Sequence, residues 1–334
     1  GRSLQSFHPQ FESGCRLLNS SKLRVQVNKY FSFETNDNGF KKLYIFKLFG
    51  LKISFGKIID TIKNKPKKLP KVYLSIAAIM KNEGPYIKEW IEYHKIVGVE
   101  RFYLYDNGST DETKKVLEPY IKDGSVIYCY TDKKCMQMPV YANAIKNSRN
   151  QTRWLALIDL DEFIVPVEKN SIKDFLKDYE DYPAVGINWV MYDSSKREKM
   201  PDMLVTEAYT TVHKDYNIKI NLHIKSIVNP KEVVEDVGNP HCFIYKHDKL
   251  AVNENFETID RGSAFTKYNS VKKIRINHYY TKSLQEYLQK TAKGYADTNR
   301  ERLFSNDALN FPDAVEDKAI FKYLPELKNR CLNK

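Results

Sequence analysis

The sequence predicts an α/β protein, in which a Rossmann-like, mixed and mostly parallel sheet is flanked by helices and preceded by an N-terminal extension. First, from Val72 onward short apolar runs alternate with segments whose apolar residues recur at helical spacing, as in strands joined by crossover helices. Second, three of these runs end in polar or acidic loops, and ligands of such sheets bind beyond the carboxyl ends of the strands. With 334 residues and 42% hydrophobic content, the chain can bury a sizeable core.

The first unit of this pattern is a strand followed by a helix. The strand is expected over Val72–Met80, and the chain turns out of it at Asn82 and Glu83. Pro85 suits the first residue of a helix, and Gly98 suits its end.

The second unit begins with a strand over residues 101–105, which runs into a polar loop over residues 106–111. Ser109 and Glu112 have the capping-box spacing for the helix that follows. The same patterns predict the later elements, namely a strand over Val126–Tyr130, a helix over 139–150, a strand over 154–158, a strand from Ala184, a strand over 274–276, a helix from Ser283 and a helix over 316–332.

The strongest chemical signal is the acidic end of one strand. Residues 154–158 are apolar, and Asp159, Leu160, Asp161 and Glu162 follow them. In an extended segment Asp159 and Asp161 would project to the same side. Two carboxylates with a third acid beside them make an oxygen site suited to Mg2+ or Mn2+, with open positions for phosphate oxygens. Right-handed crossovers would bring this loop to the same crevice as the polar loops of the first two units.

Residues 1–70 are expected to form a separate N-terminal extension. Its second half is rich in lysine and aromatic residues, which fits either a short β-hairpin over residues 43–55 or a basic amphipathic surface that rests on anionic lipid. Pro66 and Pro70 mark the expected boundary. The catalytic domain is then expected over residues 71–295, and a helical tail over residues 296–334.

Composition indicates which classes of partner the protein can bind. The net charge of +12, from 54 Lys and Arg against 42 Asp and Glu, suits an anionic partner such as nucleotide phosphate. The five cysteines have no Cys-x-x-Cys spacing and indicate neither a zinc site nor a disulfide framework. The chain has no apolar run near the roughly 20 residues of a membrane span. Nucleic acid is not an expected partner, because the sequence lacks the usual recognition motifs.

Six groups of residues, in order along the chain, carry a family resemblance. They are Lys81-Asn82-Glu83; Glu89-Trp90-Ile91-Glu92-Tyr93-His94; the run from Gly98-Val99 through Phe102-Tyr103 and Tyr105-Asp106-Asn107 to Ser109 and Asp111; Asp159-Leu160-Asp161-Glu162-Phe163; Lys225-Ser226-Ile227-Val228 with Pro230; and Asn277-His278-Tyr279 with Lys282-Ser283. Together they closely resemble glycosyltransferase family 92 and its family 2-like relatives, over residues 72–295.

The resemblance implies an A-type glycosyltransferase fold and a metal-requiring enzyme that is commonly inverting and often a galactosyltransferase. We therefore expect transfer of galactose or another hexose from a UDP-sugar to an oligosaccharide or polysaccharide acceptor, with Mn2+ or Mg2+ as cofactor. Asp161 is the expected direct metal ligand, and Asp159 reaches the metal through water or binds the ribose. The resemblance adds His278, at the end of the strand over 274–276, as a third ligand.

The donor is expected to bind along the three polar loops. Asp106 could accept a hydrogen bond from a uracil imide, and Lys225 could neutralise diphosphate. The helix that begins near Ser283 places Lys282 and its own N-terminus where a phosphate could sit. The full set of predicted nucleotide-sugar ligands is Asn82, Glu83, Asp106, Asn107, Ser109, Asp111, Asp159, Lys225 and Lys282.

The second half of the chain should supply acceptor binding and catalysis. Residues 204–209 resemble a family segment that contains an acid, so the resemblance makes Glu207 the candidate general base, with Asp193 as its rival. An inverting enzyme needs one such base to deprotonate the acceptor hydroxyl. The family tends to carry a glycine-containing loop where this chain has Asp193, so the acceptor geometry departs from the family pattern. Trp189 and His241 are the predicted acceptor-binding residues.

Two other function classes stay open. One is a non-catalytic relative that binds glycan or nucleotide, and the other is a nucleotidyl or phosphoryl transferase, which also uses paired aspartates. The glycosylation pattern Asn107-Gly108-Ser109 lies in the proposed nucleotide loop, where a glycan would block the site. We therefore expect a cytoplasmic enzyme. With the lysine-rich, aromatic N-terminal stretch, we expect it to be peripheral to the inner face of a membrane and to build a surface polysaccharide.

Overall fold

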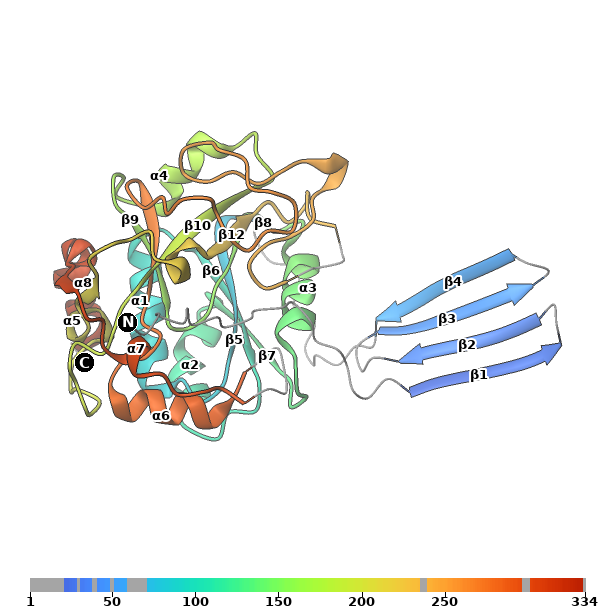
Figure 1. Ribbon diagram of the computed structural model, residues 1–334, viewed down its shortest axis with the longest axis horizontal. Helices are drawn as coiled ribbons and strands as arrows, with labels where there is room; N and C mark the ends of the chain where they lie inside the picture. Colours follow the sequence, from blue (N-terminus) through green and yellow to red (C-terminus); the bar gives the residue numbers. More distant parts are fainter. Residues whose placement is uncertain are drawn as a thin grey trace, which may run out of the picture. The chain divides into compact units, whose positions relative to one another are not determined.

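The computed structural model describes residues 21–28, 31–37, 41–48, 51–58, 71–234, 239–295 and 301–332 (Figure 1). The chain divides into two compact units, Gly1–Thr61 and Ile62–Lys334, and we describe each by itself. The predicted boundaries at residues 70 and 295 stay predictions. Pro66 and Pro70 lie outside the described residues.

The first unit contains a four-stranded antiparallel meander. Its strands are β1 (Ser21–Asn28), β2 (Phe31–Asp37), β3 (Lys41–Leu48) and β4 (Leu51–Ile58), in the order β1-β2-β3-β4. β3 pairs with β4 antiparallel from Lys41 opposite Ile58 to Leu48 opposite Leu51, as in the predicted hairpin. The sequence analysis missed β1 and β2. The lipid-facing surface stays a prediction.

The second unit is built on an eight-stranded mixed sheet in the order β7-β6-β5-β8-β12-β10-β13-β9. Neighbours are parallel from β7 to β8 and between β10 and β13, and antiparallel at β8–β12, β12–β10 and β13–β9. The strands are β5 (Val72–Met80), β6 (Arg101–Asp106), β7 (Val126–Tyr130), β8 (Thr152–Leu157), β9 (Glu162–Pro166), β10 (Ala184–Met191), β12 (Ile224–Val228) and β13 (Ile274–His278). The predicted α/β class is confirmed.

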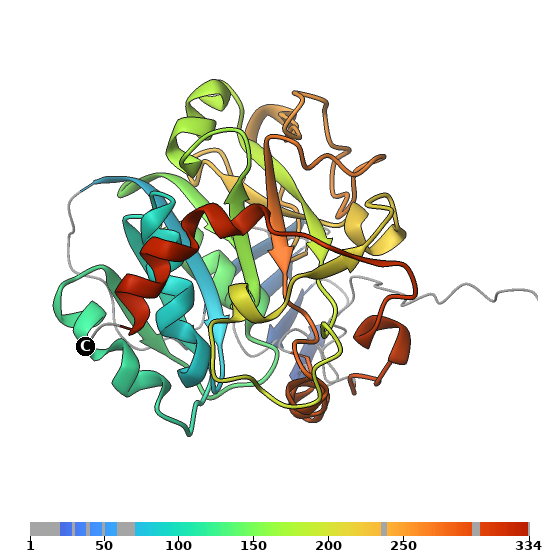
Figure 2. The ribbon, with the colours of Figure 1, turned by 90° about the vertical axis from the view of Figure 1, so that its left-hand side faces the viewer.

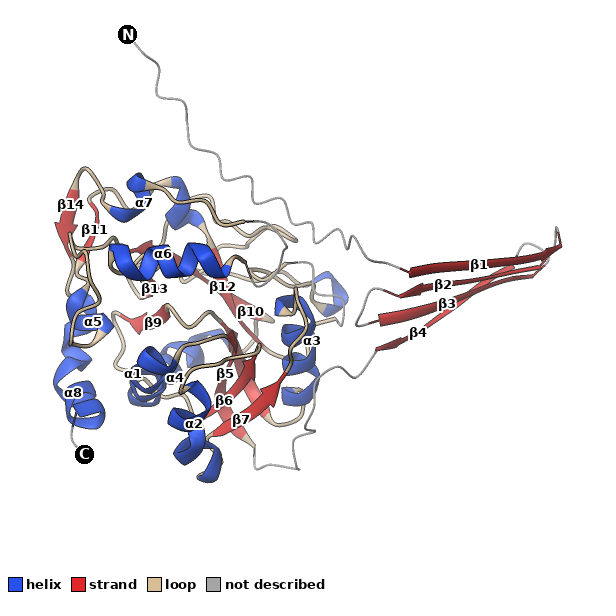
Figure 3. Cartoon of the chain, turned by 90° about the horizontal axis from the view of Figure 1, so that it is seen from below, coloured by secondary structure: helices blue, strands red, loops and turns tan. Residues whose placement is uncertain are grey.

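Helices cover both faces of this sheet (Figures 1 and 3). Alternate residues of β5 point to opposite sides, so Ile76 belongs to one buried cluster and Ala77 to another. The first cluster takes in α1 (Gly84–Ile96), α2 (Thr113–Lys122), α4 (Ile172–Leu176) and α8 (Leu324–Leu332), and the second takes in α3 (Gln137–Ser148). The remaining helices are α5 (Val205–Ala208), α6 (Leu284–Lys293) and α7 (Asn306–Leu309).

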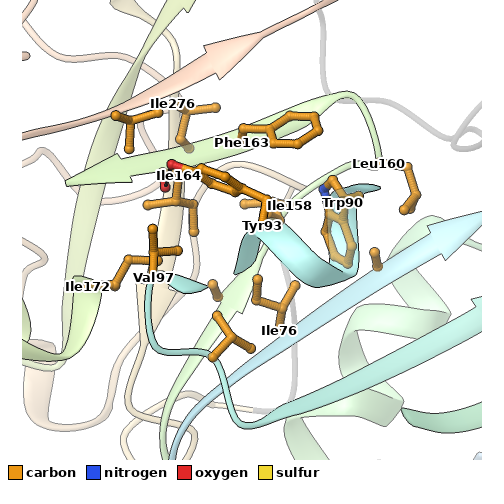
Figure 4. Close-up of a cluster of buried hydrophobic side chains, with 14 of the residues drawn as sticks. Ile76, Trp90, Tyr93, Val97, Ile158, Leu160, Phe163, Ile164, Ile172 and Ile276 are labelled. Atoms are coloured by element: carbon orange, nitrogen blue, oxygen red, sulfur yellow. Dashed lines mark hydrogen bonds between the residues drawn. The ribbon is translucent and has the colours of Figure 1, made fainter. Parts of the chain in front are cut away.

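Helix α1 fixes the strand that carries the acidic loop. The Trp90 indole N–H donates to the Glu162 carbonyl at 2.8 Å, and the Tyr93 hydroxyl donates to the Ile164 carbonyl at 3.0 Å. Both rings lie in the buried cluster with Phe163 and Leu160 (Figure 4). The turn between β8 and β9 is therefore anchored by buried apolar side chains on either side of its acids.

The C-terminal segment packs on the same unit. Helix α8 lies against α1 (Figure 2), and β14 (Ala314–Glu316) pairs with β11 (Thr211–His213). The Arg275 guanidinium of β13 pairs with the Asp317 carboxylate, and both side chains are buried. The expected helix over 316–332 begins only at Leu324, after a short 3-10 segment over Ala319–Tyr323.

Two local expectations are wrong. Glu112, not Ser109, is the residue before α2, and no side chain caps that helix. The Ser109 hydroxyl instead accepts a hydrogen bond from the Asn82 backbone N–H at 2.9 Å, because the loop after β6 folds onto the loop after β5. The acidic segment is also not extended, since Leu160 and Asp161 form a turn and the Glu162 N–H donates to the Asp159 carbonyl at 3.2 Å.

Candidate active site

The sheet topology brings one end of each of the eight strands to a common edge. β5, β6, β7, β8, β10 and β13 run in the same direction, so their carboxyl ends meet there. β12 and β9 run the other way, so their first residues lie at the same edge. In the register of the sheet, His278 at the end of β13 is directly opposite Glu162 at the start of β9. This edge gathers the predicted metal ligands.

Asp159 is held from two sides. The Lys225 ammonium lies 2.9 Å from Asp159 Oδ2, while the Gln137 amide and the Tyr141 hydroxyl donate to Oδ1 at 3.0 and 3.3 Å. Lys225 is 1% exposed at its side chain and also lies 3.8 Å from Glu162 Oε1. Its predicted contact with diphosphate is therefore replaced, in this structure, by contacts with these two carboxylates.

Asp161 faces two basic groups through one oxygen. Its Oδ2 contacts the Lys290 ammonium and lies 3.4 Å from His278 Nε2. Burial would raise the pKa of Asp161, but Lys290 and His278 outweigh it and hold that pKa well below its ordinary value. Burial lowers the pKa of Lys290 to about 8 against the pull of Asp161. Asp161 is therefore ionised at neutral pH.

His278 and Glu162 form a buried pair behind Asp161. His278 Nδ1 lies 4.0 Å from Glu162 Oε1, and neither atom has a hydrogen-bond partner among the described residues. Burial raises the pKa of Glu162, with Lys225 opposing the shift, and burial lowers the pKa of His278 below its ordinary value. A neutral imidazole whose second nitrogen faces a carboxylate is the usual arrangement of a metal-ligating histidine.

These residues fit a divalent ion with an open coordination sphere. Ligand atoms at right angles around an ion, with bonds of about 2.1 Å, lie roughly 3 Å apart, and Asp161 Oδ2 and His278 Nε2 are 3.4 Å apart. Among the described residues of the second unit, no group of three or more His, Cys, Asp or Glu side chains is arranged to hold a metal. Two protein ligands suffice where phosphate oxygens and waters complete the sphere, as is common for Mg2+.

Helix α6 places two lysines beside this edge of the sheet. Lys290 reaches Asp161, and Lys293 donates to the carbonyls of Lys81 and Asn82 at 3.1 and 3.2 Å. The N-terminus of α6 is not the predicted phosphate site. The backbone N–H groups of Leu284 and Gln285 donate to the carbonyls of Arg197 and Glu198, and Ser283 caps the helix.

Lys282 directly precedes Ser283, the N-cap of α6, and has a positive φ of 52°. Its ammonium lies 4.0 Å from the centre of the Tyr86 ring. It also affects Glu83 electrostatically, because burial raises the pKa of Glu83 and Lys282 is the largest opposing influence. The structure therefore places Lys282 beside the loop after β5, where the sequence analysis expected donor phosphate.

The two predicted nucleotide loops are interlocked by hydrogen bonds. The Asn82 side-chain carbonyl accepts from the Thr110 N–H at 2.8 Å, and the Asp111 carboxylate accepts from the Gly84 N–H at 3.0 Å. Of the predicted residues, Asn82 therefore binds Ser109 directly, whereas Asp111 binds Gly84. The Glu83 N–H donates to the Thr113 hydroxyl at 2.8 Å.

Asp106 and Asn107 fix the base of the second loop. Asp106 is 2% exposed, and its two oxygens accept from the Ser109 N–H at 2.7 Å and the Tyr128 hydroxyl at 2.7 Å. The Asn107 amide donates to the carbonyls of Thr131 and Lys133 at 3.2 and 2.8 Å. Their contacts with a nucleobase stay predictions.

The structure does not bring the two candidate bases into the carboxylate network. Asp193 is 3% exposed, and its oxygens accept hydrogen bonds from the Ser195 and Phe311 N–H groups and the Thr211 hydroxyl. Glu207 lies on α5, where Oε1 pairs with Lys328 of α8 and the side chain is 26% exposed. Asp193 therefore stabilises a loop, and Glu207 is the more accessible of the two carboxylates.

Trp189 and His241 lie behind His278. The Trp189 ring centre is 4.5 Å from His278, 5.3 Å from His241 and 4.8 Å from His223, which stacks on it. Trp189 is 6% exposed, so neighbouring rings cover the surface on which a sugar would stack. The structure thus makes Trp189 a support for His278, and its predicted acceptor contact has no exposed ring face here.

The fold and the site define a class. A mixed sheet of this order, with carboxylates in the loop that follows a central strand, is that of an A-type glycosyltransferase. The family model for glycosyltransferase family 92 matches residues 71–301. The chain belongs to glycosyltransferase family 92.

Similar proteins include glycosyltransferase family 92 proteins of Oryza sativa subsp. japonica and Ricinus communis, 26% and 25% identical over 212 residues. These matches cover 62% of this chain and 33% and 35% of the relatives, so the chain spans about a third of their length. Galactan beta-1,4-galactosyltransferase GALS2 of Arabidopsis thaliana is 32% identical over 111 residues, which is 30% of this chain and 21% of that protein. The solved structure of S. aureus TarS 1-349 with UDP-GlcNAc has a TM-score of 0.36 at 12% identity, and covers 78% of this chain and 67% of that chain.

The sequence analysis missed Lys290, Lys293, Gln137 and Tyr141, which contact the acids or the neighbouring loop. Lys290 and Lys293 are three residues apart, a spacing that places them on one face of a helix. That spacing was a usable signal. Nothing in the sequence indicated that this helix face would meet Asp161, because the contact spans 129 positions.

Proposed function

We propose that the protein transfers galactose or another hexose from a UDP-sugar to a glycan acceptor, with inversion and with Mn2+ or Mg2+. The observation that carries the proposal is the Asp161–His278 pair, backed by Glu162, at the carboxyl edge of a family 92 domain. The hexose is suggested by relatives that are named galactan beta-1,4-galactosyltransferases. The pathway, surface polysaccharide synthesis by a cytoplasmic, membrane-peripheral enzyme, is part of the proposal. No helix among the described residues is long and apolar enough to cross a membrane.

In this proposal each group at the edge has a separate task. Asp161 and His278 hold the ion, which when bound neutralises charge developing on the leaving diphosphate. Glu162 orients His278, and Lys225 balances the charge of Glu162 and Asp159.

The chain's own lysines supply further positive charge for the diphosphate. Lys282 and Lys293 stand beside the loop after β5, and Lys293 lies 3.7 Å from Glu83 Oε1. Fixed positive groups near a developing anion lower the barrier because they need no reorganisation during the reaction. Loops 82–83 and 106–111, which are bonded to each other, would enclose the nucleotide.

The acceptor hydroxyl must lose a proton when its oxygen forms a bond to the anomeric carbon of the donor sugar. In the same step the bond between that carbon and the diphosphate oxygen breaks. We keep Glu207 as the proposed base, because it is partly exposed and Asp193 is not. The Lys328 ammonium contacts Glu207 Oε1 and holds that carboxylate in place.

The test is a donor screen with purified protein. UDP-galactose, UDP-glucose, UDP-GlcNAc and GDP-mannose are each incubated with Mn2+ and glycan acceptors, and released UDP or GDP and the glycan product are measured. We expect UDP release and hexose addition from one UDP-sugar, and at least about 100-fold less with Asp161→Asn. Release of pyrophosphate from UTP and a sugar phosphate would favour a nucleotidyl transferase. Binding of UDP without any product would favour a non-catalytic relative.

A further inference from the structure

Lys290 fills a site that is built for a cation. It lies in the last turn of α6, and its ammonium contacts Asp161 Oδ2, donates to the Tyr280 carbonyl at 2.8 Å and lies 3.9 Å from the centre of the Tyr280 ring. A carboxylate, a carbonyl and an aromatic face are three groups that attract positive charge. The Lys290 side chain is 22% exposed, so solvent screens this ion pair only in part.

The oxygen that Lys290 uses is also the one that faces His278. Asp161 Oδ2 lies 3.4 Å from His278 Nε2. A divalent ion shared by these two atoms would stand about 2.1 Å from Oδ2. The Lys290 ammonium already occupies hydrogen-bonding distance of the same oxygen, and two cations so close together repel strongly. The ion and the ammonium therefore cannot both use Asp161 Oδ2.

We propose that Lys290 is an internal competitor for the divalent ion, which neutralises Asp161 until the ion displaces it. This inference rests on the metal site of the proposed function. It explains how a largely buried carboxylate avoids standing unpaired when no ion is bound, which would cost stability. It also predicts that the protein binds the ion more weakly than its ligands alone would allow.

Lys293 offers a matched control on the same helix face. Its ammonium donates to the carbonyls of Lys81 and Asn82 and lies 3.7 Å from Glu83 Oε1. Replacing it removes the same charge from α6 without removing the contact with Asp161 Oδ2. A general electrostatic effect would act on both variants, whereas direct competition acts on Lys290 alone.

The experiment measures Mn2+ binding without nucleotide, by electron paramagnetic resonance of the free ion, at fixed pH and salt. Lys290→Met should bind Mn2+ about tenfold or more tightly than the wild-type protein, since losing a competing contact of about 1.4 kcal/mol corresponds to tenfold. Lys293→Met should stay within about threefold of wild type, and Lys290→Arg, which keeps the charge, should not reach the affinity of Lys290→Met. Equal affinities of Lys290→Met and Lys293→Met would overturn the proposal.

The outcome separates this inference from the metal site on which it rests. If neither the wild-type protein nor Lys290→Met binds Mn2+, the metal site itself is wrong. A second measurement needs no variant: reductive methylation of the wild-type protein, read by mass spectrometry, should modify Lys290 faster with Mn2+ than without, because its ammonium is released. An unchanged rate at Lys290, in protein that demonstrably binds Mn2+, contradicts competition.

Discussion

At the scale of single residues, Glu162 shows how a buried acid can act without touching a substrate. It is fully buried, accepts from the Asp159 N–H at 3.1 Å and faces His278 Nδ1 at 4.0 Å. Glu162→Gln replaces the carboxyl group that faces the imidazole and Lys225 with an amide, and we expect Mn2+ affinity to fall by about 10- to 100-fold. The measurement is a calorimetric Mn2+ titration, with the exposed Glu168→Gln as the control. Wild-type affinity in Glu162→Gln, with the fold intact, would show that His278 needs no partner.

Substitution of the two candidate bases should have opposite effects on stability and on activity. Asp193→Asn places an amide donor among the Ser195 and Phe311 N–H donors, so we expect a loss of about 1–3 kcal/mol of unfolding free energy. Glu207→Gln changes a partly exposed side chain, and we expect unchanged stability with at least about 100-fold lower turnover. Urea unfolding measures the stability of both variants, and the transfer assay measures their turnover. Full activity in Glu207→Gln would remove it as the base.

Individual residue types were predictable from the sequence, but many of their contacts were not. Asp159 and Asp161 were identified because acids follow an apolar strand, and the family resemblance added His278 at the end of another strand. The sheet brings these strand ends together. Lys225 was identified as a basic site residue, but its burial against Asp159 and Glu162 depends on β12 running antiparallel to β8. That direction is set by tertiary packing and leaves no local signal.

At the scale of elements, α1 is a fully integrated core helix, and its histidine makes the fold sensitive to acid. His94 Nδ1 donates to the Trp90 carbonyl at 2.8 Å, and Nε2 accepts from the Ile164 N–H at 3.3 Å, an arrangement that requires the neutral ring. Burial lowers the pKa of His94 to about 3. The ordinary pKa is about 6.5, so between these values the unfolded chain binds a proton that the folded chain does not. Stability is therefore full above about pH 6.5 and falls as the pH drops toward 3.

The expected slope from His94 is about 1.4 kcal/mol per pH unit, or about 2 kcal/mol between pH 6.5 and 5. Urea unfolding at several pH values measures it. His94→Gln should show a shallower slope than wild type by that amount, while the exposed His247→Gln should keep the wild-type slope. Other buried histidines contribute to both curves equally. Identical slopes in wild type and His94→Gln would show that His94 titrates alike in both states.

The elements themselves were predicted best where periodicity was strong. The apolar run over Val72–Met80 and the Pro85-led helix match β5 and α1. The capping box at Ser109 failed because Ser109 bonds to Asn82 across the loops, so a tertiary contact replaced a local one. β9 was missed because its strand begins directly at Glu162, after a turn of only two residues.

At the scale of the whole molecule, the C-terminal tail is tied to the sheet that carries His278. Asp317 is held by the Arg275 guanidinium at the start of β13 and by the hydroxyls of Tyr192 at 2.9 Å and Tyr216 at 2.5 Å. Burial would raise the pKa of Asp317, but its hydrogen bonds and charge interaction with Arg275 lower it well below the ordinary value. The pair thus contributes stability above about pH 4, and this contribution is lost as the pH falls through the depressed pKa.

Removing one member of this pair should therefore destabilise the sheet and the site together. Asp317→Ala leaves the Arg275 guanidinium buried without its carboxylate, and we expect a loss of about 3–5 kcal/mol of unfolding free energy. Glu326→Ala, which breaks the exposed pair with Arg330 on α8, should change stability by less than about 1 kcal/mol. Arg275→Met combined with Asp317→Leu removes both charges and should recover much of the loss, because buried ion pairs gain little over apolar packing. If Asp317→Ala were as stable as Glu326→Ala, the contact between the C-terminal tail and β13 would not stabilise the sheet. The position of His278 would then depend on the sheet alone.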